Sequence, residues 1–111
     1  MQLEPVELEA KFRGTGRARG KAEYEVEREH GGLQVKFEVE VKKAVRGEHD
    51  VLVGGVLVGR IRIDSRGRGK LEFSSRPDED ALPLPSDFPV IGVGTPVEVV
   101  GLFTATMQPD D

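Results

Sequence analysis

His49 is the residue best suited to chemistry in this sequence, because it stands between two carboxylates, Glu48 and Asp50, just before a short apolar run. Histidine and carboxylates are common metal ligands. A metal site also needs further ligands in matched geometry, with hydrogen-bonded support around them, and the only other histidine is His30, beside a glycine pair. We therefore expect no metal site. His49 should hydrogen-bond to backbone at a bend and His30 should lie in an exposed loop, while His49 and Asp50 stay the candidates for a metal ligand.

Residues for nucleophilic or acid–base catalysis do not gather in a recognisable pattern. The chain has no cysteine, and none of its serines stands in the G-x-S-x-G context of a hydrolase nucleophile. Most glutamates alternate with apolar residues, which is the pattern of a solvated strand face. The acidic stretch 77–80 lacks the spacing of a calcium-binding loop and is expected to be a solvated loop. The sequence predicts no catalytic residues, no cofactor and a protein that is not an enzyme.

Two glycine-rich basic segments, residues 13–20 and 65–69, are the candidates for anion binding. Neither continues into the G-K-[ST] sequence and helix of a phosphate-binding loop. A sandwich fold that brings them to one end, near Arg60 and Arg62, would form an anion-binding edge. The residues predicted for that edge are Arg17, Arg19, Arg66 and Arg68. The alternative is that both segments are simply solvated turns. With one tyrosine and no tryptophan, stacking platforms for bases are scarce, so no nucleic-acid partner is expected.

The elements that must position these residues alternate strictly between apolar and polar side chains. This period of two predicts strands over residues 6–13, 21–28 and 33–42, joined by glycine-rich turns. A second group follows at 50–53, 56–64 and 69–74, with a two-residue turn at Gly54–Gly55 and a bulge or kink at Gly59.

The last third of the chain reads differently. Five of the seven prolines fall in residues 76–96, which predicts a long crossover loop. Its apolar side chains are expected to cover an open end of the core: Leu82, Leu84, Phe88, Val90 and Ile91. A final strand is predicted over 97–107, bent at Gly101. We expect an all-β fold, a Greek-key antiparallel β-sandwich or flattened barrel of seven or eight strands. It would be a single domain over residues 1–107 with a flexible tail at 108–111.

The bulk composition excludes few classes of function. The 111 residues carry a net charge of −4, but residues 1–70 hold 15 basic and 12 acidic groups, and residues 71–111 hold one basic and eight acidic. No apolar run is long enough to span a bilayer, so no membrane insertion is expected. No leader peptide is visible at the start. The compartment stays open, with a secreted or cell-envelope location favoured if a leader has been trimmed.

The chain contains, in this order, Gly14-x-Gly with Gly20-Lys-Ala-x-Tyr24, then Gly47-x-His49, and then Ile91-Gly92-x-Gly94. The order of these pieces resembles the Cu,Zn superoxide dismutase-like and chordin-type (CHRD) β-sandwich family. The first piece is similar to that family's first hairpin. Gly47-x-His49 is similar to its G-x-H strand, and the stretch from Val58 to Leu71 to its hairpin with a D-x-x-G turn. Ile91-Gly92-x-Gly94 resembles its late I-I-G strand. Small secreted bacterial sandwich modules look equally similar.

The resemblance implies a sandwich, but the family's metal ligands are missing. At the positions of the expected H-x-H, this sequence has Leu52 and Gly54, and no cysteines stand in for the family's disulfide. Fold alone does not carry the activity. We therefore expect a non-enzymatic, non-catalytic bacterial module with a structural, adhesive or protein-interaction role, whose partner is another protein or a second copy of itself. The alternatives are a degenerate superoxide dismutase-like protein that retains weak metal or ligand binding, and an engineered scaffold, suggested by the absence of Asn and Cys.

Overall fold

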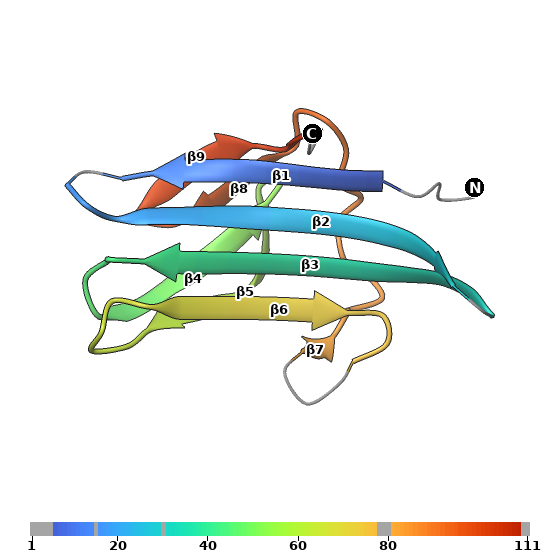
Figure 1. Cartoon of the computed structure of the whole chain (residues 1–111), viewed down its shortest axis with the longest axis horizontal. Coiled ribbons are helices and arrows are strands. Elements are labelled where there is room, and N and C mark those ends of the chain that lie inside the picture. The colour runs from blue at the N-terminus through green and yellow to red at the C-terminus, as the bar shows by residue number, and fades with distance from the viewer. Residues whose placement is uncertain (1–5, 15, 30, 78–80, 110–111) are drawn as a thin grey trace.

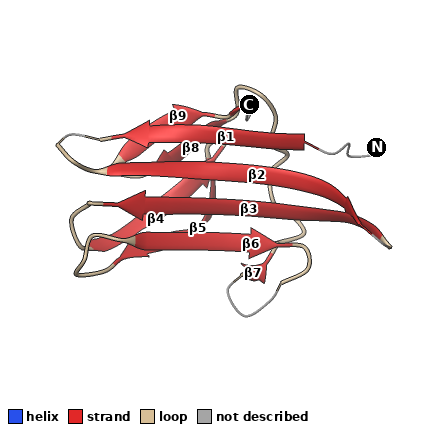
Figure 2. Ribbon diagram, viewed as in Figure 1, coloured by secondary structure: helices blue, strands red, loops and turns tan. Residues whose placement is uncertain are grey.

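The computed structural model describes residues 6–14, 16–29, 31–77 and 81–109, which form two packed sheets without a helix in those ranges. Figure 1 shows the larger sheet in front of the smaller one, and Figure 2 shows that strands make up nearly all of both layers. The prediction of an all-β sandwich is confirmed, with ten strands among the described residues in place of seven or eight. The pairing is antiparallel as predicted, except that Phe73–Ser74 pairs in parallel with Leu82–Pro83.

The larger sheet has six strands in the order β10-β1-β2-β3-β6-β7. Its bounds are β1 (Val6–Arg13), β2 (Arg19–Glu29), β3 (Gly32–Lys42) and β6 (Gly69–Ser74), flanked by the two-residue strands β7 (Leu82–Pro83) and β10 (Gln108–Pro109). The smaller sheet has the order β5-β4-β8-β9. Its bounds are β4 (Gly47–Val53), β5 (Val56–Ile63), β8 (Pro96–Val99) and β9 (Phe103–Thr106).

The core lies between the inward faces of the two sheets. Alternate residues of each long strand are buried there, because successive side chains point to opposite faces of a strand. The rings of Phe12 and Phe103 stack with centroids 5.3 Å apart and join β1 to β9. On the opposite side, β5 contacts β6. The sandwich is therefore closed at both sides, and the charged residues of the large sheet are left on its outer face.

Two turns illustrate how local sequence sets the register. Gly54 and Gly55 have φ values of +57° and +82°, which glycine adopts at no steric cost, and they join β4 to β5. The predicted irregularity near Gly59 is confirmed, because Val51 pairs with Gly59 and Leu52 with Leu57, so that Val58 is the extra residue of a bulge.

Strand bounds agree closely with the alternation of the sequence, with four differences. Leu82 and Pro83, expected to lie in the crossover loop, pair with β6 as β7. β4 begins at Gly47, so His49 lies inside a strand and not at a bend before it. The predicted single strand over 97–107 is wrong: β8 and β9 form a hairpin, since Gly101 turns the chain with a φ of +86°. Gln108 and Pro109, expected to be part of a flexible tail, pair with β1 as β10.

The proline-rich segment covers the core only in part. Leu84, Phe88 and Ile91 pack against or within it, as predicted, and the Phe88 ring lies 5.3 Å from that of Phe37. The prediction that these side chains cover the core is wrong for Leu82 and Val90, because both are exposed. The segment thus closes one end of the sandwich while leaving apolar side chains in solvent.

Candidate functional site

The outer face of the β1–β2 hairpin pairs like charges with like charges. Four cross-strand pairs point outward on this hairpin, and each joins two residues of the same sign: Arg13 with Arg19, Lys11 with Lys21, Glu9 with Glu23, and Glu7 with Glu25. Side chains directly opposite each other in an antiparallel pair are close neighbours, and like charges there are destabilising. The hairpin therefore carries an arrangement that does not favour its own folding.

The same sorting continues across β3 and β6 as rows perpendicular to the strands. We call the row that contains Arg13 and Arg19 the cationic row, and the row that contains Glu9 and Glu23 the glutamate row. Register places Lys42 beside Arg19 in the cationic row. The glutamate row holds one residue from each of four strands: Glu9, Glu23, Glu38 and Glu72. Between them lies a mixed row of Lys11, Lys21, Glu40 and Lys70. The large sheet thus presents positive charge at one end of its strands and negative charge at the other.

Ion pairs within the face run along the strands, from the mixed row into the glutamate row. Lys21 Nζ lies 2.8 Å from Glu23 Oε1, and Lys70 Nζ lies 3.2 Å from Glu72 Oε1. The hydrogen bond and charge of Glu23 raise the pKa of Lys21. Burial raises the pKa of Glu38, although the nearby Lys70 opposes this. The lysines of the mixed row therefore compensate much of the repulsion within the glutamate row.

The cationic row has less compensation. Lys42 pairs with Glu40 at 3.3 Å, but within the described part of the chain no carboxylate lies in salt-bridge distance of Arg13 or Arg19. Two open depressions, of about 350 and 530 Å³, meet here along Glu40 and Lys42. Their cationic lining, which we call the basic end, consists of Lys11, Arg13, Arg19, Lys21, Lys42, Arg62, Arg68 and Lys70.

The structure brings the two predicted basic loops to the same end of the sandwich, but only part of the predicted set lines the depressions. Arg19 lines one and Arg68 lines the other. Arg17 and Arg66 are exposed in the turns beyond them. The Asp64 carboxylate is engaged by the turn itself, since it accepts hydrogen bonds from the backbone N–H of Arg66 and Arg68, which lower its pKa. Anion binding at these residues stays a prediction.

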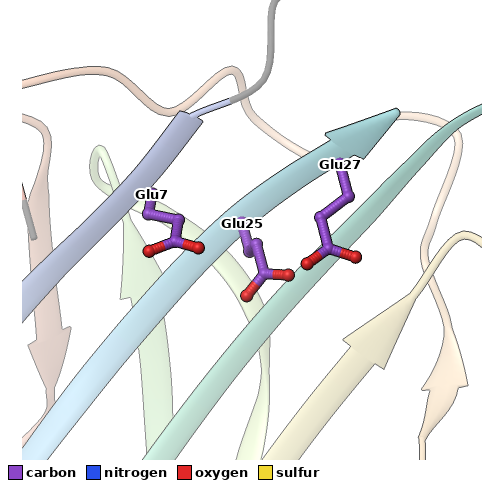
Figure 3. A group of neighbouring side chains, drawn as sticks. All are labelled: Glu7, Glu25 and Glu27. Atoms are coloured by element: carbon purple, nitrogen blue, oxygen red, sulfur yellow. The ribbon is translucent and has the colours of Figure 1, made fainter. Parts of the chain in front are cut away.

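The opposite end of the face holds an acidic trio, Glu7, Glu25 and Glu27. Figure 3 shows Glu7 on β1 and the other two on β2, and one carboxylate oxygen from each lies within 4.8 Å of the others. The hydrogen bond with Glu27, partial burial and the charges of Glu27 and Glu7 raise the pKa of Glu25 to about 7, although Lys36 opposes the shift. Glu25 therefore keeps its proton to a higher pH than an ordinary glutamate does.

His49 and Asp50, the candidates for a metal ligand, lie on opposite faces of β4. His49 Nδ1 is 2.8 Å from the carbonyl oxygen of Val100, and this contact joins β4 to the turn between β8 and β9. The expected hydrogen bond of His49 to backbone is confirmed. Asp50 accepts a hydrogen bond of 2.8 Å from Arg60 Nε. Among the described residues, the one group of three or more potential ligand atoms is the acidic trio and does not include His49.

Sequence reasoning missed most of the basic end. Lys11, Lys21, Lys42 and Lys70 were interpreted as ordinary outward positions of separate strands. Their neighbourhood depends on the pairing of β3 with β6, which are separated in sequence by the whole β4–β5 hairpin. The available signal was the sign of the outward charges, since β1 and β2 each change from one sign to the other along their length.

Comparisons with known proteins add no identity to this geometry. No protein-family model matches the chain and no curated protein matches it significantly, so the resemblance to superoxide dismutase-like sandwiches stays a prediction. In the described ranges, no helix has the length and apolar character needed to cross a bilayer. His30 and residues 78–80 of the acidic stretch lie outside the described residues.

Proposed function

We propose that this protein is a non-enzymatic interaction module that engages a charged partner through the outer face of its six-stranded sheet. The observation that carries the proposal is the set of four like-charged pairs between β1 and β2. Exchanging a lysine with the neighbouring outward glutamate on one strand alone would give attractive facing pairs at no change in composition. Local arrangements that oppose folding are characteristic of functional surfaces.

The partner is expected to be met by the sheet face and not by an internal site. Among the described residues, Ser74 is the one buried polar residue, and apart from it the core consists of aliphatic and aromatic side chains. Ser74 Oγ accepts hydrogen bonds from Gln34 and from the backbone N–H of Arg76. Charge complementarity contributes chiefly to specificity and to the rate of association. A binding or adhesive role suits a surface of this kind, and the module is proposed to work without a cofactor.

A charge-shuffled variant tests the proposal with composition held constant. Exchanging Lys21 with Glu23 on β2 alone turns the facing pairs Lys11–Lys21 and Glu9–Glu23 into pairs of opposite charge without altering net charge. Wild type and variant are compared in low salt for binding to three immobilised polymers: a polyanion, a polycation and a neutral polysaccharide. The proposal predicts binding of at least one charged polymer that the variant loses. Equal behaviour of the two proteins on every polymer would contradict it.

A further inference from the structure

The geometry points to the basic end as a binding site for a linear anionic polysaccharide, lying across the strands with one sulfate or carboxylate group at each strand. This inference rests on the proposed function and names the partner's chemical class. The cationic row supplies the first contact line, and Arg68, which lines the second depression together with Lys42, extends it toward β6. The row then reads Arg13, Arg19, Lys42 and Arg68 on four successive strands or their ends.

Spacing favours a sugar chain over other polyanions. Neighbouring strands lie about 4.8 Å apart, so the row offers one cation at roughly the interval of one sugar unit in an extended polysaccharide. Phosphates of a polyphosphate chain follow one another more closely than that. Three of the four cations are arginines, whose planar guanidinium groups bind sulfate and carboxylate through two parallel hydrogen bonds.

Charge, and not stacking, is what this surface offers. Tyr24 and four of the five phenylalanines are buried, and the fifth, Phe88, packs against the core. Nucleic acids that bind as single strands are held largely by base stacking on aromatic rings. Arg13 and Arg19 have no ion pair with a described carboxylate, so a ligand anion meets them without displacing an internal partner.

Fluorescence titration with size-defined dextran sulfate, repeated between 50 and 200 mM salt, measures the site. Four neutralised charges give a slope of about −3 for log K against log salt, which is a loss of about 50-fold in affinity over that range. The variant Arg13→Gln/Arg19→Gln should bind at least tenfold more weakly with about half the slope. The matched control Arg28→Gln/Lys36→Gln, which removes two cations from the other end of the same sheet, should remain within threefold of wild type.

Each of the following results would overturn the inference. Some of them would leave the proposed function standing, and one would reject it as well. Equal losses in both variants would mean that only net charge matters. Single-stranded DNA or polyphosphate of equal charge binding tenfold more tightly than dextran sulfate would reject a sugar chain as the ligand. Binding of poly-lysine alone would leave the proposed function standing and place the site at the acidic end. Failure of all polymers, or light scattering that reveals a dimer sensitive to Arg19→Gln, would reject the polysaccharide site. Failure of all polymers would reject the proposed function as well.

Discussion

Replacing Arg19 with glutamate should stabilise the protein while removing its proposed binding activity. Arg19 stands between Arg13 on β1 and Lys42 on β3 and takes part in no ion pair with a described residue. The substitution converts two repulsive cross-strand pairs into two attractive ones. Cross-strand pairs contribute roughly 0.2–1 kcal/mol each, and exposed ion pairs lie at the low end of that range.

The expected gain is about 1 kcal/mol in the free energy of unfolding, or about 4 °C in melting temperature. Urea denaturation at 20 mM salt measures the first and differential scanning calorimetry the second. Arg19→Gln should give about half of the gain, because it removes repulsion without adding attraction. Arg17→Glu makes the same change of charge in the turn, without a cross-strand partner, and should have little effect.

Salt separates the electrostatic cause from other effects of the substitution. At 1 M salt the screening length falls to about 3 Å, so the gain of Arg19→Glu should largely disappear. A variant that is less stable than wild type at low salt, or whose gain persists at 1 M, would refute the claim that like-charged pairs strain this face.

Three further predictions concern the acidic trio, a close backbone contact and the core. The raised pKa of Glu25 means that the folded chain keeps a proton that the unfolded chain, with its ordinary value of 4.5, releases. Stability should therefore fall by about 1 kcal/mol, after allowance for solvent screening, as the pH rises from about 5 to 8. Glu25→Gln should flatten that part of a melting-temperature profile, and an unchanged profile would contradict the raised pKa of Glu25. Gly20→Ala should lower the free energy of unfolding, measured by urea denaturation, by about 1–3 kcal/mol, since the added Cβ would lie 2.8 Å from the carbonyl oxygen of Glu40. A denaturation midpoint equal to that of wild type would show that β2 and β3 move apart at no cost. Met107→Ala, at a side chain with no exposed surface, should cost about 2–5 kcal/mol, and a smaller loss would indicate that the site collapses around the cavity.

How far the sequence predicts this fold depends on whether the signal is local. The alternation over Val6–Arg13 and Gly69–Ser74 gives β1 and β6 with the observed bounds, because one face of each strand is buried and the other solvated. The same alternation predicts a single bent strand where the structure has the hairpin of β8 and β9. The reversal at Gly101 is an effect of backbone conformation, which alternation does not reveal.

The candidate site was predictable only in part, for the same reason. The two arginine-rich loops can be recognised in the sequence, and the sandwich brings them to a common end. The rows are a property of register between strands. Glu38 and Glu72 are 34 residues apart in the chain, yet they face each other. Strand order in a sheet of this kind is set by non-local packing, which the local alternation of residues does not reveal.

The most direct test of the central claim is to locate the ligand on the protein by nuclear magnetic resonance. We expect titration with dextran sulfate to shift the backbone amide signals of Arg13, Arg19, Lys42 and Arg68. The signals of Glu7, Glu25 and strands β8 and β9 should remain in place. Shifts centred on β4 and β8, or a spectrum unchanged at saturating polymer, would contradict the assignment of the large sheet's outer face as the binding surface.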